Sequence, residues 1–214
     1  MRHILSFRFS RAACTYDEWA IPQRETAKKL VEFVKPKGLI LDLGCGTGFV
    51  SEYISEGTVI GLDISEKMVK IYRERFGRGI LGDAENLPFK DKSFDYVLSN
   101  FVLHWTDWKK SISEALRVSK KGAGISIPVE GSVSFSEFSF PREEDILKTF
   151  KPADYRIVEV EIPFSGFELV KFFHYTGTSL YRGKKKLRTK RKLEELVRHS
   201  RKEKFRVLLL KFLK

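Results

Sequence analysis

The sequence contains few cysteines and few uncharged amides. Cys14 and Cys45 are the two cysteines among 214 residues, too few for a disulfide framework, so both are expected to be free thiols. Gln23 is the single glutamine, and Asn86 and Asn100 are the two asparagines, beside abundant lysine, arginine and glutamate. This bias is frequent in proteins from hot environments and predicts a thermophilic source. It says nothing about activity.

Three further absences argue against a membrane-spanning protein, a secreted protein and a metal site. No apolar run approaches the roughly 18 residues that cross a bilayer. The opening residues, MRHILSFRFSR, lack the apolar stretch and small-residue cleavage site of a signal peptide. His3, His174 and His199 share no metal-ligand spacing with one another or with the cysteines. We therefore expect a cytoplasmic protein with no membrane partner and no metal site.

The net charge of +12 is unevenly distributed along the chain. Residues 1–181 carry 25 basic and 25 acidic side chains, whereas residues 182–214 carry 15 basic and 3 acidic ones. A basic segment of this kind can attract an acidic protein, nucleic acid or an anionic membrane surface. A solvated, charged helix face is the more common reason for such a run.

Hydrophobic patterning over the first 130 residues alternates short apolar strands with amphipathic helices. Expected strands are Gly38 to Leu43, Thr58 to Asp63, Gly79 to Gly82, Phe94 to Asn100 and Gly124 to Val129. Expected helices are Gln23 to Lys35, one through Val50 and Ile54, one that Ser65 opens as N-cap, and one through Ile112 and Leu116. This alternation predicts an α/β fold with a parallel sheet covered on both faces.

After Pro141 the pattern is less regular. Arg156 to Phe164 and Phe205 to Phe212 are the expected late strands. Helices are expected at Phe167 to Tyr175 and at Thr189 to His199.

A strand that runs directly into a glycine-rich turn marks a ligand site. Residues 39–43, LILDL, are followed by GCGTG at 44–48, and a helix is expected next. Glycine permits positive φ and lets a ligand approach the backbone, and the helix start offers free N–H groups. Asp63 follows Gly44 by nineteen residues, at the end of the next strand, where a carboxylate can bind both hydroxyls of a ribose. The pattern predicts a nucleoside cofactor on a doubly wound sheet.

Four successive segments narrow the identity of that cofactor. Within residues 42–105, four segments resemble the ordered motifs of the class I S-adenosylmethionine-dependent methyltransferases. They are DLGCGTGF, GLDIS, LGDAENLPF and FDYVLSNFVLHW. The resemblance implies a Rossmann-like, doubly wound, mostly parallel seven-stranded sheet with helices on both faces and the last strand antiparallel. The two late strands would be the final two of the seven.

The resemblance also implies which residues bind S-adenosyl-L-methionine. The glycines of the turn would line the methionine moiety, Asp63 would bind the ribose, and Asn100 would lie beneath the methionine end. Asp42 would hold the turn. The full set that the resemblance assigns to the cofactor is Asp42, Gly44, Cys45, Gly46, Gly48, Asp63, Ile64, Asp83, Ala84 and Asn100.

A dinucleotide site and a purely structural turn fit the glycine pattern less well. Dinucleotide-binding dehydrogenases usually have G-x-G-x-x-G, whereas the third glycine here falls one position earlier. The later GDAENLPF segment has no counterpart in that fingerprint. A turn with a purely structural purpose would leave Asp63 and Asp83, both at strand ends, unexplained.

Segments outside the cofactor motifs bear on the methyl acceptor, because acceptor specificity resides in the loops that cap the sheet. These segments are Phe9 to Asp17 with Gln23 and Arg24, Ser99 and Asn100 with Trp105, Gly131 with Ser132, and His174 to Leu180. Together they resemble the malonyl-[acyl-carrier-protein] methyltransferases of biotin synthesis. The resemblance implies that the free carboxylate of a malonyl thioester, on acyl carrier protein or coenzyme A, is esterified. His104, where many members have glutamine, and the basic insert at residues 184–192 depart from that pattern.

Such a substrate needs positioning and no general base. A malonyl carboxylate is ionised near neutral pH, since unperturbed carboxyl pKa values are about 4. A cationic or hydroxyl group must still hold it in line with the methyl group. Arg11, Tyr16 and His104 are the acceptor-positioning candidates. Their alternative roles are a surface charge, a packed lid residue and a hydrogen-bonded pocket residue, respectively.

The basic segment would bind the carrier if the acceptor is attached to an acidic carrier protein. Complementary charge accelerates docking, so the carrier is expected to dock on residues 182–192. Nucleic acid is a less favoured partner: the pI of 9.6 fits an RNA methyltransferase, but residues 99–102, SNFV, lack the prolines of an N-P-P-Y motif. A methyltransferase for a quinone or another carboxylic acid, and a non-catalytic protein with this fold, stay open as alternatives.

We expect a single methyltransferase domain over residues 1–214. Its expected parts are an N-terminal cap or lid with the first helix at 1–35, a cofactor-binding core at 38–130, and substrate-side elements with the C-terminal strands at 131–214, which include a basic segment at 182–206.

Overall fold

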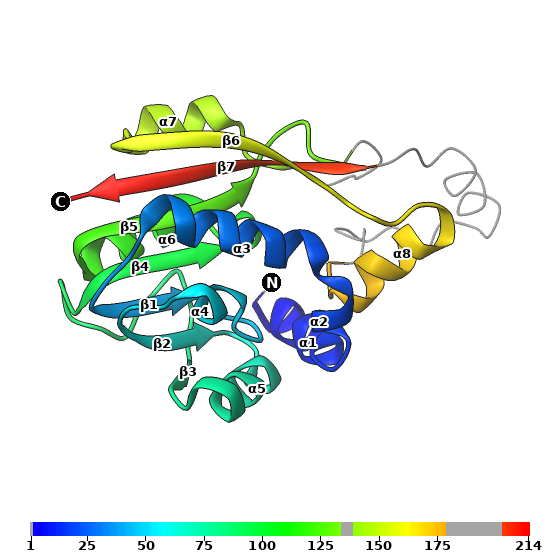
Figure 1. The fold of residues 1–214 in the computed structure, drawn as a ribbon, viewed down its shortest axis with the longest axis horizontal. Helices are drawn as coiled ribbons and strands as arrows, with labels where there is room; N and C mark the ends of the chain where they lie inside the picture. The colour runs from blue at the N-terminus through cyan, green and yellow to red at the C-terminus, as the bar shows by residue number, and fades with distance from the viewer. Residues whose placement is uncertain (1, 134–138, 179–202) are drawn as a thin grey trace.

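The computed structural model describes residues 2–133, 139–178 and 203–214, and its described strands form one sheet of seven (Figure 1). The strands are β1 (Leu39–Leu43), β2 (Thr58–Asp63), β3 (Gly79–Leu81), β4 (Phe94–Asn100), β5 (Ser119–Pro128), β6 (Asp154–Glu161) and β7 (Lys204–Leu213). Their order across the sheet is β3-β2-β1-β4-β5-β7-β6. Strand β7 is antiparallel to β5 and β6, and the other neighbours are parallel. The predicted doubly wound, mostly parallel seven-stranded sheet is confirmed.

Helices cover both faces of this sheet. They are α1 (Arg2–Ala12), α2 (Tyr16–Trp19), α3 (Ile21–Val34), α4 (Phe49–Tyr53), α5 (Glu66–Phe76), the 3₁₀ turn η1 (Leu103–Trp105), α6 (Trp108–Val118), α7 (Glu143–Phe150) and α8 (Gly166–Tyr175). None of the helices in the described ranges is long and apolar enough to cross a bilayer.

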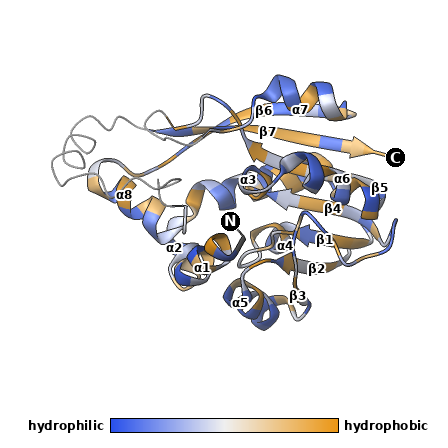
Figure 2. Ribbon diagram, turned by 180° about the vertical axis from the view of Figure 1, so that it is seen from behind, coloured by the Kyte–Doolittle hydropathy of each residue, from blue (hydrophilic) through white to orange (hydrophobic). Residues whose placement is uncertain are grey.

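Two buried clusters lie on opposite faces of the sheet. In β1, Ile40 belongs to the cluster with α3, α4 and α8, whereas Leu41 belongs to the cluster with α6 and α7. In β7, Leu209 and Leu210 divide in the same way, because successive strand residues point to opposite faces. Figure 2 shows the result as a band of hydrophobic colour along β7, a strand buried over most of its length.

Local signals account for where several helices start. Ser65 caps α5 as predicted, and its hydroxyl accepts a hydrogen bond from the Met68 N–H at 3.3 Å. Asp107 caps α6 through bonds from the next turn's N–H groups. Helix α3 begins at Ile21, two residues before the predicted start, with Pro22 in its first turn, where a missing N–H costs nothing.

Some expected elements differ from the structure. Strand β5 begins at Ser119, five residues before the predicted Gly124, because alternation is lost in the Lys-Lys-Gly stretch that opens it. The pattern predicted no helix over α1, α2 or α7. The helix predicted at residues 189–199, the basic run at 184–192 and most of the segment 182–206 lie outside the described residues.

The N-terminal helices pack across the carboxyl ends of the central strands (Figure 1). The hydroxyls of Ser10 in α1 and Ser65 before α5 are 2.8 Å apart. Asp17 in α2 pairs with Arg75 in α5 at 2.5 Å, and Arg75 also donates to the Thr47 carbonyl at 3.2 Å. These contacts place α1 and α2 over the glycine turn.

Candidate functional site

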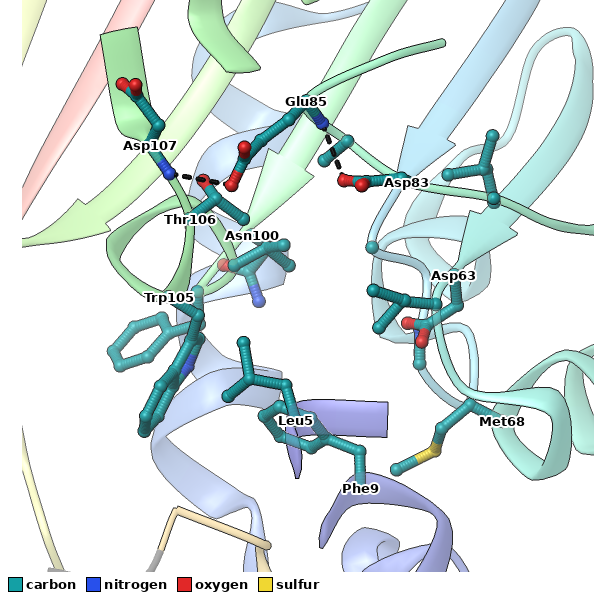
Figure 3. A pocket seen from close by; sticks show the side chains of 18 of the residues that line it. Leu5, Phe9, Asp63, Met68, Asp83, Glu85, Asn100, Trp105, Thr106 and Asp107 are labelled. Atoms are coloured by element: carbon teal, nitrogen blue, oxygen red, sulfur yellow. Dashed lines mark hydrogen bonds between the residues drawn. The ribbon is translucent and has the colours of Figure 1, made fainter. Parts of the chain in front are cut away.

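A cavity of about 630 Å³ opens where the carboxyl ends of β1, β2 and β4 meet (Figure 3). The strand order reverses between β1 and β4, and open α/β sheets bind ligands at such a switch point. Figure 3 shows Asp63 and Met68 on one side of the cavity and Asn100 and Trp105 on the other, with Phe9 of α1 between them.

The glycine turn forms the floor of the cavity. Its glycines at positions 44 and 46 differ in what a side chain there would meet. The N–H groups of Gly44 and Cys45 both donate to the Leu62 carbonyl, at 2.7 and 3.0 Å, which ties the turn to β2. Gly44 has φ +71°, and a Cβ there would lie 2.3 Å from a methyl carbon of Val102. Gly46 has φ +52°, but a Cβ there would meet nothing within 4 Å. Gly44 is therefore required by packing, whereas Gly46 leaves open space beside the cavity.

Asp63 ends β2 with its carboxylate held between the turn and α5. One oxygen accepts from the Gly46 N–H at 2.9 Å, and the other accepts from the Ser65 N–H at 2.8 Å. Burial raises the pKa of this carboxyl, and the backbone hydrogen bonds oppose that rise. The arrangement fixes an acidic group at the cavity wall.

Asp42 lies under the turn, outside the cavity. Its side chain is buried and accepts a hydrogen bond from the Ser51 hydroxyl at 2.8 Å, and that hydroxyl lies 2.6 Å from the Tyr72 hydroxyl. Burial raises the pKa of Asp42 to about 7, and the hydrogen bond from Ser51 opposes the shift. Asp42 thus belongs to a buried polar chain that supports the turn.

The structure brings most of the residues assigned to the cofactor together at the cavity wall. Those that line it are Gly44, Gly46, Asp63, Ile64, Asp83, Ala84 and Asn100. Asp42, Cys45 and Gly48 do not line it, and their assignment to the cofactor stays a prediction. The Cys45 side chain is buried and points to Gly61 of β2, and Gly48 caps α4 against Phe76.

One wall of the cavity comes from a helix that sequence patterning missed. His3, Leu5 and Phe9 of α1 line the cavity, while Ile4 and Phe7 of the same helix are 58% and 62% exposed. Apolar side chains thus occur on both faces of α1, so no helical periodicity marked it. The segment's resemblance to relatives was the one signal that could have found it.

A second, smaller cavity adjoins the first, and we call it the aromatic recess. Its volume is about 30 Å³, room for a group of a few heavy atoms. It shares Phe9, Tyr16, Phe101 and Trp105 with the main cavity. Its other lining residues are Gln23, His104, Val133, Phe140, Phe173, Thr178 and Phe205.

Two of the three acceptor-positioning candidates lie at this recess. Tyr16 stacks on Phe49 with ring centres 5.8 Å apart, and burial, followed by the charge of Asp63, raises its pKa. His104 is buried, and its ring centre is 4.9 Å from that of Trp105. The third candidate, Arg11, lies away from the recess.

Arg11 lines neither cavity. It is exposed on α1, and its guanidinium lies 5.9 Å from the ring centre of Phe7. The inward face of α1 is taken by His3, Leu5, Phe9 and Ser10, so this cation is directed to the surface.

The lining of the main cavity suits a nucleoside that carries a positive charge. Four carboxylates line it, from Asp63, Asp83, Glu85 and Asp107, and no lysine or arginine of the described residues does. Carboxylates focus a negative potential in a cleft and attract cations. The open space at Gly46 and the apolar walls leave room for the uncharged parts of such a ligand.

The chain matches a family model and several curated proteins. Residues 41–127 match the methyltransferase domain model. An uncharacterized protein of Methanocaldococcus jannaschii is 36% identical over 151 residues, which are 69% of this chain and 73% of that protein. The malonyl-[acyl-carrier protein] O-methyltransferase of Herminiimonas arsenicoxydans is 32% identical over 178 residues, 79% of this chain and 68% of that enzyme. The enzyme of that name from Erwinia pyrifoliae is 38% identical, but the chain spans about half of its length, 51%.

Solved structures of low sequence identity share the fold. A methyltransferase of Thermotoga maritima, described as a possible histamine N-methyltransferase, superposes with a TM-score of 0.61 at 20% identity and covers 99% of each chain. A methyltransferase of an antibiotic biosynthesis pathway from Anabaena variabilis gives a TM-score of 0.63 at 16% identity and covers 89% of this chain and 98% of that one. At these identities the likeness concerns the fold alone.

Proposed function

The chain belongs to the class I S-adenosylmethionine-dependent methyltransferases, and we propose that it esterifies the free carboxylate of a malonyl thioester in biotin synthesis. The observation that carries this proposal is the 178-residue match to a malonyl-[acyl-carrier protein] O-methyltransferase. That match extends well beyond residues 41–127, the shared methyltransferase domain. It therefore includes residues outside the shared domain, and acceptor specificity resides in the segments that cap the sheet.

S-adenosyl-L-methionine, the cofactor, supplies a methyl group bound to a positively charged sulfur. We propose that Gly46 and Asp63 hold its methionine and ribose parts, with Ile64 and Ala84 beside the adenine. Asp42 would act indirectly, by supporting the turn through Ser51. The carboxylates at the cavity wall favour a cationic ligand.

Methyl transfer to a carboxylate requires orientation and the exclusion of water. Because the acceptor is already ionised near neutral pH, no residue has to remove a proton. Tyr16 and His104, at the aromatic recess, are the residues we propose to position it. The recess, about 30 Å³ in volume, has room for a carboxylate.

The acceptor would reach the site on acyl carrier protein or on coenzyme A. We propose that an acidic carrier docks on the basic residues 182–192, and that residues 1–214 act as one methyltransferase domain. The basic residues lie outside the described part of the chain, so their charge alone supports the docking proposal.

Labelled S-adenosylmethionine tests the proposed acceptor directly. The purified chain is incubated with malonyl-carrier protein, malonyl-coenzyme A or RNA. Acetyl-carrier protein serves as the matched control, since it lacks the free carboxylate. We expect base-labile label on the malonyl thioesters and none on the acetyl control. Label in RNA alone, or none on either malonyl thioester, would contradict the proposal.

A further inference from the structure

Gln23 is a buried polar residue whose side chain has no hydrogen-bond partner among the described residues. It lies in the first turn of α3 and is 3% exposed. Its Oε1 is buried without a hydrogen bond in the described part of the chain. A buried carbonyl oxygen without a partner is unfavourable, so native structures rarely retain one without a reason.

The Gln23 side chain lines the aromatic recess next to the cavity. Its backbone is fixed there, because the Asn100 side-chain N–H donates to the Gln23 carbonyl at 2.9 Å. The Ser126 hydroxyl in turn donates to the Asn100 Oδ1 at 2.6 Å. The tips of β4 and β5 thus hold the start of α3, which places Gln23 at the recess.

The other polar groups of the recess are few and largely uncharged. Tyr16, His104 and Thr178 are the remaining polar residues in its lining, and the rest are aromatic or aliphatic. No lysine or arginine of the described residues lines it. A carboxylate bound there would be held mainly by neutral hydrogen-bond donors.

We propose that Gln23 binds the acceptor carboxylate in the aromatic recess through its side-chain amide. This inference rests on the proposed function. The two ends of a carboxamide are similar in size, so rotation about its last bond can present the Nε2 donor to the ligand. A neutral donor orients the carboxylate without cancelling its charge. A lone pair of the carboxylate oxygen forms the new O–CH₃ bond, while the pair of the breaking S–CH₃ bond passes to sulfur.

Three variants separate this role from a structural one. Gln23→Leu keeps the size of the side chain and removes its hydrogen bonds. Gln23→Glu places a carboxylate opposite the acceptor. Thr26→Val is the matched control, because Thr26 is a buried polar residue one turn later on α3 that lines neither cavity. Each variant is tested for turnover of malonyl-coenzyme A, for binding of S-adenosylhomocysteine and for melting temperature.

We expect Gln23→Leu to raise the KM for malonyl-coenzyme A about tenfold or more, as for loss of a hydrogen bond to a charged group. Its affinity for S-adenosylhomocysteine should stay within about twofold of wild type, and its melting temperature should not fall. For Gln23→Glu, kcat/KM should fall further as pH rises and the new carboxyl ionises. Thr26→Val should keep the wild-type KM.

The outcomes distinguish this inference from the proposed function. If the wild type turns over a malonyl thioester and Gln23→Leu has the wild-type KM, the role of Gln23 is overturned and the proposed function stands. No turnover of any malonyl thioester by the wild type would overturn both. If Gln23→Leu does not fold, Gln23→Met, which has a flexible side chain of similar length, gives the same comparison.

Discussion

Among single residues, Asp42 should make the stability of the fold depend on pH. Its pKa is about 7 in the folded protein, against 3.8 for an unperturbed group. Between these values the folded state retains a proton that the unfolded chain releases, so stability falls as pH rises and then levels off. Asp42→Asn does not titrate. The stability of this variant relative to wild type should therefore rise by up to ~4 kcal/mol from about pH 4 to pH 7.

Urea unfolding at pH 4.5 and pH 8 measures this difference. Asp95→Asn is the control, because hydrogen bonds from the Leu39 N–H and from Lys121 keep the pKa of Asp95 below its usual value. Its stability relative to wild type should vary little over that window. Parallel pH profiles for Asp42→Asn and wild type would show that Asp42 does not hold the raised pKa.

Substitution of Gly46 tests whether the cofactor approaches the glycine turn. Gly46→Ala adds a methyl group in open space beside the cavity, at φ +52°. Gly77→Ala is a matched control, since Gly77 has φ +79°, has nothing within 4 Å of its Cβ position, and lies outside the cavity. Both variants should lose about 1 kcal/mol of stability from backbone strain.

Only Gly46→Ala should also weaken S-adenosylhomocysteine binding, by about tenfold or more, because its methyl group occupies ligand space. Calorimetry on the two variants checks this. Equal affinity in both would mean that the cofactor does not approach the turn at Gly46.

Residues were predictable from sequence where chemistry fixes both their type and their spacing. Gly44 and Asp63 stand at a set distance along one strand-turn-helix-strand unit, and both line the cavity. Gln23 and Arg11 could not be judged in this way. Whether α3 and α1 turn these side chains toward the recess or toward solvent depends on packing between distant segments.

At the scale of elements, Arg75 joins the cap to the core. It pairs with Asp17 of α2 and donates to the Thr47 carbonyl of the turn. Arg75→Met should free α2, and α1 with it, so that trypsin cleaves more quickly after Arg8 or Arg11. Because the pair is partly exposed, the global loss of stability should be about 1 kcal/mol or less.

The matched control is Arg142→Met, which removes an exposed pair with Asp145 at the start of α7. It should leave cleavage in α1 at the wild-type rate. Equal cleavage of Arg75→Met and wild type in a time course followed by mass spectrometry would contradict a tether between cap and core.

Helices were predictable from the sequence where apolar side chains lie on one buried face. They were missed where apolar side chains do not follow that pattern. Helix α5 buries Met68, Val69 and Tyr72 on one face, the periodicity from which its helix was expected. Helix α1 has apolar side chains both toward the cavity and toward solvent, so the pattern carried no period. Helix α7 buries one residue, Ile146, and opens with three acidic residues, a composition typical of a charged loop.

At the scale of the whole molecule, the sheet gathers the site from distant parts of the chain. Parallel order brings the ends of β1, β2 and β4 to one edge, and the N-terminal helices close over it. The alternation of strands and helices was sufficient to predict the sheet. It could not predict the cap, whose position follows from side-chain contacts such as that between Ser10 and Ser65.

The uneven charge of the chain supports a last prediction, on carrier docking. Reversing Lys184, Lys185 and Lys186 to glutamate should lower kcat/KM for malonyl-carrier protein about tenfold at low salt, since steering by complementary charge would be lost. Added salt should shrink the difference, because ions screen such attraction. Turnover of malonyl-pantetheine should be unchanged, as this acceptor has no charged carrier.

A matched triple reversal tests whether net charge alone accounts for the effect. Lys28, Lys35 and Lys37 lie around the end of α3 and the start of β1, at the opposite edge of the sheet from the cavity. Their reversal to glutamate changes the net charge by the same amount, but we expect it to lower carrier turnover much less. Equal loss in the two triple variants would assign the effect to overall charge. Equal loss on malonyl-carrier protein and malonyl-pantetheine in the first variant would rule out docking through these lysines.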